Sequence, residues 1–340
     1  MINFLQLKHI FSWVAYNFGL LRMFSSKNNS IIVAYHHVLP ENDKRIQFLQ
    51  PGMYVSEKSF ESHMKYLVAH YDVVPLNDII HAGKTRKACS VTFDDGWSDN
   101  YEYAYPILKK YKIPATFFLA TNFIGTNKWP WPDRMSYYIH NSASEEIDSI
   151  VSQLQDNFEA GKCLSKLQAL PRNKSLAAEY LIDTLKQLNN DDLKSAIDII
   201  EKNVSCNHSE LSALLPFLTW EQINEMSNNN MSFGAHTHNH IILDRVKQDQ
   251  IKDEIATSQA ILADKLKKKI DTFSYPNGWY NQHAVDTLGA LGFTIAVTTR
   301  KGTVKESESN LALRRILIHD DIADTLPMFA CRLEKRLFLF

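Results

Sequence analysis

The sequence predicts an α/β fold in which parallel strands form a (β/α) barrel. Short apolar runs alternate with amphipathic helical segments along most of the chain, as expected when helices connect successive parallel strands. About seven or eight such runs are present, which points to a barrel. The chain has 340 residues, 45% of them hydrophobic and 22% charged, which is enough for a barrel with one insertion.

Residues 1–30 precede this alternation and are predicted to form an amphipathic helix followed by a linker. Met1–Phe24 carries apolar residues at helical spacing, but Lys8 and Arg22 interrupt them. No secretory signal or spanning helix is evident, so we expect a cytoplasmic protein. Two alternatives stay open for the helix. It packs on the barrel, or it lies on the inner face of a membrane as a peripheral contact with Trp13 inserted. The polar stretch Ser25–Ser30 is interpreted as the linker.

Residues 31–340 are predicted to form the barrel itself. Ser56 is expected to cap a helix that runs to about His70, because apolar residues then recur at spacings of three and four. Further along this half, a helix is expected over Asn100–Tyr111. The strands expected here are Ile31–Tyr35, Asp72–Pro75, Cys89–Phe93 and Ala115–Ala120.

The segment from about residue 141 to 212 has a different character. It is polar, helix-prone and without strand signals, so it is predicted to be a helical insertion that serves as a lid or as a passive buttress. The alternation then resumes with a capping box formed by Thr219 and Gln222. The elements expected after it are strands at Met231–Ala235, Thr272–Tyr275, Phe293–Val297 and Leu313–Ile318, and helices at Gln248–Leu266 and from Asn281 to Gly292.

Charge and cysteine content exclude several classes of protein. The formal net charge is −1, with 37 basic and 38 acidic residues, so no nucleic-acid partner is expected. The four cysteines form no CxxC pair and no zinc knuckle. A reducing compartment fits this usage.

Polar clusters follow three of the predicted strands, where the active sites of barrels lie. Asp94, Asp95 and Gly96 come directly after the strand that ends at Phe93. Neighbouring side chains on a strand point to opposite sides, so one carboxylate can bind a cation while the other addresses water or substrate. An ordinary turn between two elements is the structural alternative.

Three histidines in five residues follow the strand that ends at Ala235. His236 and His240 can converge on one ion, while His238 between them points away. Two imidazoles and one carboxylate form a ligand set that leaves coordination positions open. A divalent ion, with zinc as the first choice, could then activate water while Asp94 takes the proton.

Other residues near the predicted strand ends are weaker candidates. His319 ends the last strand and could protonate a departing amine, although a lone histidine is more often structural. His36 follows the first strand and could border the pocket. Tryptophans near a site suit stacking on sugar faces, and Trp131 is the candidate here, with burial in the core as the alternative. The strand-and-turn tract Tyr275, Pro276 and Asn277 is also assigned to substrate binding.

These motifs resemble those of the polysaccharide deacetylase family, carbohydrate esterase family four, with its chitooligosaccharide deacetylase homology domain. Val91–Gly96 and His236–His240 resemble the first two motifs of that family, in the same order. Phe273–Gly278 resembles the third motif of one branch, to which Tyr35–Pro40 and Tyr103–Phe118 are also similar. The similarity extends from about Ile31 to His319.

The resemblance implies a distorted barrel with about seven strands and a helical insertion. It implies metal-assisted hydrolysis of N-acetyl or O-acetyl groups on an amino-sugar polysaccharide, oligosaccharide or glycolipid. By matching position, Asp94 is the general base, Asp95, His236 and His240 are the metal ligands, and His319 is the general acid.

Two features depart from the family pattern. The third motif of many members has an arginine that orients the catalytic aspartate, and Ser274 stands at that position. The tryptophan-containing fourth motif has no clear counterpart near Arg300. Arg300, Arg314 and Arg315 are the alternatives for the missing charge.

Two other functions are compatible with the same sequence. One is a carbohydrate-binding or scaffold protein that keeps the barrel without turnover. The other is a metal hydrolase that acts on a different amide or ester. The intact set of Asp94, Asp95, His236 and His240 favours the deacetylase.

Overall fold

The protein consists of two compact units. The structure is a computed structural model, and it describes residues 4–21, 30–82, 87–158, 173–205, 214, 216–305 and 307–334. One unit comprises Met1–Glu41, Gly52–Thr126 and Phe217–Phe340, and the other comprises Asn42–Pro51 and Asn127–Pro216.

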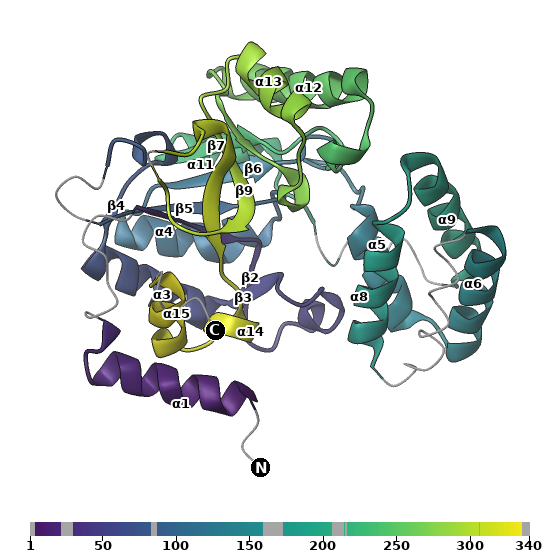
Figure 1. The fold of residues 1–340 in the computed structure, drawn as a ribbon, viewed down its shortest axis with the longest axis horizontal. Helices are drawn as coiled ribbons and strands as arrows, with labels where there is room; N and C mark the ends of the chain where they lie inside the picture. The colour runs from purple at the N-terminus through teal and green to yellow at the C-terminus, as the bar shows by residue number, and fades with distance from the viewer. Residues whose placement is uncertain are drawn as a thin grey trace. The chain divides into compact units, whose positions relative to one another are not determined.

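The first unit is built on a closed barrel of parallel strands (Figure 1). Eight strands follow the order β1-β10-β9-β8-β7-β6-β5-β4, and β1 also pairs with β5, which closes a barrel of seven strands and leaves β4 outside it. The predicted distorted (β/α) barrel with a helical insertion is therefore confirmed. The barrel strands are β1 (Ile31–Tyr35), β5 (Ala88–Phe93), β6 (Ala115–Leu119), β7 (Met231–Ala235), β8 (Thr272–Ser274), β9 (Ile295–Lys301) and β10 (Leu313–Leu317).

Aromatic side chains form a continuous row across one side of the barrel wall. Tyr35, Phe93, Phe117 and Phe233 are register partners on β1, β5, β6 and β7, and successive rings lie 5.6, 4.6 and 5.7 Å apart. Tyr35 also contacts Phe60 of the following helix, so this row faces the outer layer. Because strand side chains alternate, Thr92 and Asp94 face the barrel interior.

Apolar side chains form a buried cluster within the barrel unit. Ile32, Phe118, Val297 and Leu313 belong to one buried cluster, although they come from strands that are not all neighbours. Leu76, in the short segment after β4 (Asp72–Val73), joins the same cluster. In barrels of this kind the carboxyl ends of the strands are the usual place for a site.

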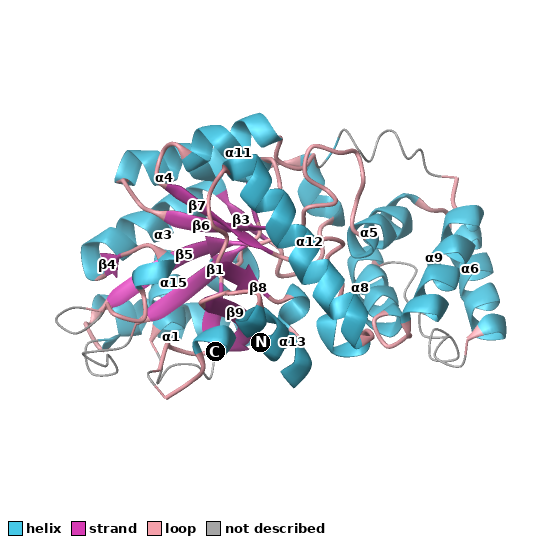
Figure 2. Ribbon diagram, turned by 90° about the horizontal axis from the view of Figure 1, so that it is seen from above, coloured by secondary structure: helices cyan, strands magenta, loops and turns pink. Residues whose placement is uncertain are grey.

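Helices surround the strands of this unit (Figure 2). Their caps follow the sequence signals: Ser56 caps α3 by accepting from Ser59 N, and Thr219 and Gln222 form the capping box of α11. The helices are α3 (Glu57–His70), α4 (Tyr105–Tyr111), α11 (Trp220–Ser227), α12 (Gln248–Leu266), α13 (Gln282–Ala290), α14 (Asp320–Ala323) and α15 (Leu326–Leu333).

Several element bounds differ from the prediction. The strand predicted at Phe293–Val297 is β9, which begins two residues later at Ile295 because Gly292, at φ +79°, and Phe293 complete the end of α13. Asn100–Ala104 is a π-helical stretch that leads into α4. A parallel pair, β2 (His37–Leu39) with β3 (Tyr54–Ser56), was not predicted, since its strands are only three residues long.

The N-terminal helix α1 (Phe4–Asn17) packs against α15 of the same unit. The linker predicted at Ser25–Ser30 lies outside the described residues except for Ser30, as do Cys163 and Cys206. Cys89 and Cys331 are free and buried. Among the described residues, no helix is both long and apolar enough to cross a membrane.

The second unit is a bundle of helices. It contains α5 (Trp131–Asn141), α6 (Ser144–Asn157), α8 (Lys174–Leu185) and α9 (Asn190–Asn203), with α5 against α8 and α6 against α9. Ser136 of α5 donates to the Phe48 carbonyl at 2.6 Å, which ties the short segment Asn42–Pro51 to the bundle. The unit therefore extends beyond the insertion predicted at residues 141–212 on both sides.

Candidate active site

Two adjacent carboxylates stand at the carboxyl end of β5. Asp94 N donates to the Tyr35 carbonyl at 3.0 Å, which continues the ladder between β5 and β1 into the site. The chain then turns sharply, with φ +74° at Asp95 and +87° at Gly96. A Cβ on Gly96 would lie 2.7 Å from the Leu119 side chain, so glycine is required both for the turn and for this close approach. The turn points the two carboxylates in different directions.

Asp95, His236 and His240 converge on one point. Asp95 Oδ1 lies 3.4 Å from His236 Nε2 and 3.3 Å from His240 Nε2, and the three groups offer ligand atoms that all lie within 4.8 Å of one another. Asp95 Oδ1 is buried and has no hydrogen-bond partner among the described residues. A buried acceptor without a partner is costly, whereas a cation held by all three groups would satisfy it.

The histidine loop is fixed from two sides. His236 Nδ1 lies 2.7 Å from the Ser274 carbonyl, so this nitrogen carries the proton and Nε2 presents its lone pair toward Asp95. Buried Glu254 of α12 accepts hydrogen bonds from His238 N and from both the backbone and side-chain nitrogens of Asn239. These bonds hold a loop in which Thr237 and His240 have φ of 60° and 56°.

The second oxygen of Asp95 is held by a stack of aromatic rings. Trp97 Nε1 donates to Asp95 Oδ2 at 3.2 Å. The Trp97 ring lies between Phe217 and His37, with ring centroids at 4.2 and 4.5 Å. His37 in turn bonds Asp99 at 2.7 Å. Asp95 therefore has one oxygen fixed within the protein and one directed toward the two imidazoles.

Asp94 forms a buried ion pair with Arg315 of β10. The guanidinium donates to both carboxylate oxygens, at 2.8 and 2.6 Å. It also donates to Thr92 Oγ1, Ser274 Oγ and the Thr298 carbonyl. Arg315 has no exposed surface. Of the three arginines considered from the sequence, Arg315 is the one that reaches the aspartate, across the barrel interior.

Burial and charge act against each other on the ionisable groups. Burial raises the pKa of both carboxyls, but Arg315 brings the pKa of Asp94 below its ordinary value, and the neighbouring histidines hold that of Asp95 far below. Burial lowers the pKa of His240 to about 4. Asp94 and Asp95 are thus ionised and His240 is neutral at neutral pH, as a base and metal ligands require. His236 differs, because burial is outweighed by the hydrogen bond to Asp95 and the two carboxylate charges, which raise its pKa.

Of the weaker candidates, His36 lies at the site, whereas Tyr275 and Pro276 are enclosed within the barrel unit and Trp131 belongs to the second unit. His36 lies beside Asp94, with Nε2 4.0 Å from Asp94 Oδ2, and burial lowers the pKa of His36. The Tyr275 hydroxyl is engaged within the protein, where it donates to the Leu311 carbonyl. Pro276 is buried, and the Asn277 carbonyl accepts from Thr299. Trp131 is the half-buried first residue of α5 in the second unit.

His319 follows β10, as predicted. Its Nδ1 lies 3.0 Å from Asp321 Oδ2, and the ring lies beside Gly52. The side chain is 18% exposed, so the ring is open to solvent at one edge. Its role as an acid stays a prediction.

Trp97, Glu254 and Asp99 support the site and were not predicted. Trp97 directly follows the Asp-Asp-Gly turn, and that adjacency was the only local signal for it. Glu254 lies within a long amphipathic helix, where its burial is the feature that separates it from the surface acids. No local pattern marks that position.

The part of the sequence that contains these site residues matches a known protein family. The profile described as polysaccharide deacetylase matches residues 81–157 and 173–296, which is more than half of the chain. A poly-beta-1,6-N-acetyl-D-glucosamine N-deacetylase of Staphylococcus epidermidis is 27% identical over 225 residues, which cover 61% of this chain and 72% of that protein.

Two solved structures share the fold. The Streptococcus pyogenes deacetylase PplD in complex with acetate has a TM-score of 0.58 at 19% identity, covering 91% of this chain and 100% of that chain. IcaB from Ammonifex degensii has a TM-score of 0.56 at 19% identity, covering 89% of this chain and 97% of that chain.

Fold and site together define a barrel hydrolase with a candidate metal centre at the strand ends. The chain belongs to the polysaccharide deacetylase family.

Proposed function

We propose that the protein is a metal-dependent hydrolase that removes N-acetyl groups from an amino-sugar polysaccharide, oligosaccharide or glycolipid. The observation that carries the proposal is the convergence of Asp95, His236 and His240 next to a separately anchored Asp94. The name of the Staphylococcus epidermidis relative supports an N-acetylated glucosamine polymer as the substrate class. O-acetyl groups are the second choice.

The residues at the site fit a divalent ion, and zinc suits them best. One carboxylate and two imidazoles are typical zinc ligands. Bond lengths of about 2.1 Å in a tetrahedral arrangement place ligand atoms about 3.4 Å apart, close to the spacings of 3.3 and 3.4 Å around Asp95 Oδ1. A bound ion would polarise the acetyl carbonyl and make water more acidic.

Asp94 is proposed as the general base. As a water oxygen attacks the carbonyl carbon, its proton passes to the Asp94 carboxylate, which Arg315 keeps ionised and oriented. Arg315 donates to both oxygens, so the carboxylate cannot rotate away from the reacting water. Asp94 and the ligand Asp95 then keep separate tasks although they are neighbours in sequence.

His319 is proposed as the general acid. When the carbon–nitrogen bond breaks, the amine leaves as a neutral group only if it gains a proton, which His319 would supply. His319→Ala should therefore slow acetate release from N-acetyl sugars by about a hundredfold and barely affect an aryl acetate, whose leaving group needs no proton. Equal losses on both substrates would remove His319 from this role.

His36 and Asn277 are proposed to contact the sugar, and buried Tyr275 and Pro276 are proposed to shape the turn that presents Asn277. Sugar binding by Trp131 is a separate proposal for the second unit. The position of His36 beside Asp94 supports its assignment. Membrane contact through the N-terminal helix is a further proposal that does not depend on this chemistry.

The decisive experiment combines metal analysis with acetate release. The purified protein should contain a stoichiometric divalent metal and release acetate from N-acetylglucosamine oligomers in preference to simple acetyl esters. Chelation should abolish turnover, and zinc should restore it. A metal-containing protein that binds the oligomers without releasing acetate would favour the scaffold alternative, and preference for a non-sugar amide would favour the other hydrolase.

Two histidines of one motif provide a matched pair of variants. His240→Ala should lose the bound metal, because its Nε2 faces Asp95. His238→Ala should keep the metal, because His238 instead contacts Thr121 Oγ1 through Nδ1 at 2.9 Å. Full metal content in the His240 variant would contradict the ligand set.

A further inference from the structure

Small residues of the helix α1 face α15 of the barrel unit. Ser12 Oγ lies 3.4 Å from Met328 Sδ, and the Cys331 thiol lies 4.0 Å from the Ser12 carbonyl. Ser12 and Ala15 are buried. Small side chains of α1 therefore lie at its contact with α15.

The large apolar residues of α1 face the opposite way. Five of the eight large hydrophobic residues exposed in the described part of the chain lie in this short segment. At 3.6 residues per turn Leu7, Ile10 and Trp13 lie on the side of the helix opposite Ser12 and Ala15, and Phe11 lies at the edge of that side. Phe18 directly follows the helix. We call this set the outer apolar face: Leu7 (52% exposed), Ile10 (53%), Phe11 (36%), Trp13 (56%) and Phe18 (71%). This inverts the usual arrangement of a surface helix, whose apolar side faces the core.

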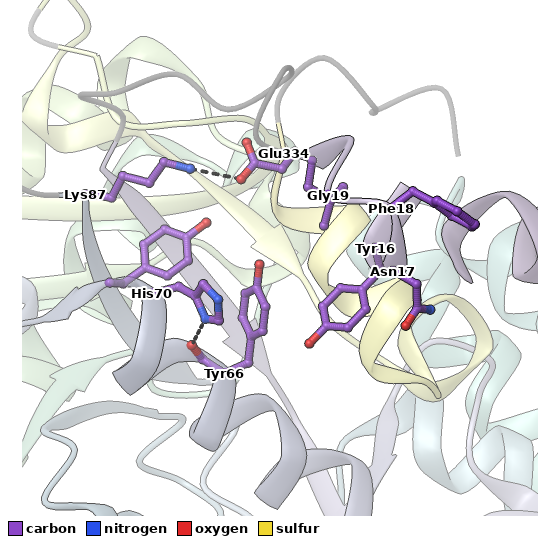
Figure 3. A pocket seen from close by; sticks show the side chains of 10 residues that line it. Tyr16, Asn17, Phe18, Gly19, Tyr66, His70, Lys87 and Glu334 are labelled. Atoms are coloured by element: carbon purple, nitrogen blue, oxygen red, sulfur yellow. Dashed lines mark hydrogen bonds and ion pairs between the residues drawn. The ribbon is translucent and has the colours of Figure 1, made fainter. Parts of the chain in front are cut away.

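A pocket of about 740 Å³ lies at the C-terminal end of the same helix (Figure 3). The Tyr16, Tyr66 and Tyr71 rings line it, together with Phe18 of the outer apolar face. Lys87 and Glu334 form an ion pair at its edge, 2.9 Å apart. Tyrosine rings, apolar with a polar tip, suit the boundary between hydrocarbon and water. The outer apolar face therefore continues into a surface of interfacial character.

Both signs of charge lie beside the helix, since His9 is 3.7 Å from Asp324 and Glu334 pairs with Lys87, but basic residues are the more numerous. The sequence has no acidic residue before Glu41, whereas Lys8, Arg22 and Lys27 precede it. Lys8 also lies close to two cations of the barrel unit, since burial together with Arg332 and Lys8 lowers the pKa of Lys301 to about 8. A cationic edge beside an apolar face suits an anionic lipid surface. It disfavours a second copy of this chain, whose equivalent edge has the same charge.

We propose that α1 lies in the plane of an anionic membrane surface, with its outer apolar face inserted among the lipid chains. With 14 residues the helix is about 21 Å long, too short to span a bilayer but suited to lying in its interface. The small inner face then anchors the rest of the unit to the membrane.

The test measures sedimentation of the full chain with vesicles of phosphatidylcholine and phosphatidylglycerol. The wild-type protein should sediment with these vesicles, and less so with pure phosphatidylcholine or at high salt. The double variant Trp13→Glu, Phe18→Glu should partition at least about tenfold more weakly, since each substitution replaces an inserted apolar side chain with a charge. Leu176→Glu is the matched control, because Leu176 is 44% exposed on a helix of the second unit.

Several outcomes would overturn the proposal. One is wild-type protein that stays in the supernatant, and another is a double variant that sediments like the control. Equal binding to neutral vesicles would overturn the anionic surface. A dimer that becomes monomeric in the double variant, without vesicle binding, would assign the outer apolar face to a second copy instead. Circular dichroism and an unchanged unfolding midpoint establish that the double variant is folded.

Discussion

Two sectors of the barrel mouth differ in which strands their functional side chains come from. In the sector formed by β5 and β7, the candidate metal ligands come from two short motifs, each directly after its strand. In the sector formed by β8 and β10, Ser274 occupies the position expected for an arginine, and the charge comes from Arg315 of β10 instead. Ligands that must meet at fixed spacing are confined to local motifs, whereas a supporting charge can come from any strand that faces the same interior.

The largest expected effect tests the base in the first sector. Asp94→Asn should reduce acetate release by about 10²–10⁴-fold, because the amide cannot accept the proton from water. Metal content should remain at the wild-type level, since Asp94 is held by Arg315 and is not among the converging ligand groups. Unchanged turnover would remove Asp94 from the role of general base.

This division also shows what the sequence alone can predict. The strands that end at Phe93 and Ala235 were located by their apolar runs, and the candidate ligands follow from motif spacing and from the family resemblance. The Arg315 partner could not be selected, because Arg300, Arg314 and Arg315 are close in sequence and only the barrel's closure decides which one points inward. Arg300 lies over the Tyr280 ring, and Arg314 pairs with Glu308.

The second prediction concerns stability in the β8 and β10 sector. Arg315→Met should reduce the free energy of unfolding by about 3–5 kcal/mol, because it leaves the Asp94 carboxylate buried without its partner. Arg314→Met is the control, and loss of its partly exposed ion pair should cost at most about 1 kcal/mol. Urea unfolding of both variants measures the difference. Equal losses would mean that the buried pair contributes no more than a surface pair.

The third prediction concerns the hydrogen bonds that support the proposed metal-binding loop at His236–His240. Glu254→Gln should weaken metal retention by about 10–100-fold, the usual effect of disturbing groups that orient ligands. The amide places a donor where the loop nitrogens need an acceptor. Competition with a chelator measures the affinity, and Glu225→Gln, at an exposed acid that accepts from Tyr101, is the control. Equal affinities for the two variants would exclude this role.

The smallest expected effect comes from Ser274 of β8, which contributes one hydrogen bond to Arg315 of β10. Ser274→Ala removes one of the hydrogen bonds of Arg315, so the free energy of unfolding should fall by only about 1 kcal/mol. The Ser274 carbonyl that bonds His236 is retained in this variant. If the loss equals that of Arg315→Met, then Ser274 and not the ion pair dominates this sector. The same urea titration provides the comparison.

The left-handed backbone at Asp95, Thr237 and His240 has a consequence for metal exchange. Such conformations cost non-glycine residues about 1–3 kcal/mol each, and the surrounding hydrogen bonds maintain them. The proposed ligands are thereby arranged before any ion arrives, so an incoming ion would not have to order the loop. Ions of similar size would then compete mainly through their intrinsic affinities and their abundance in the cell.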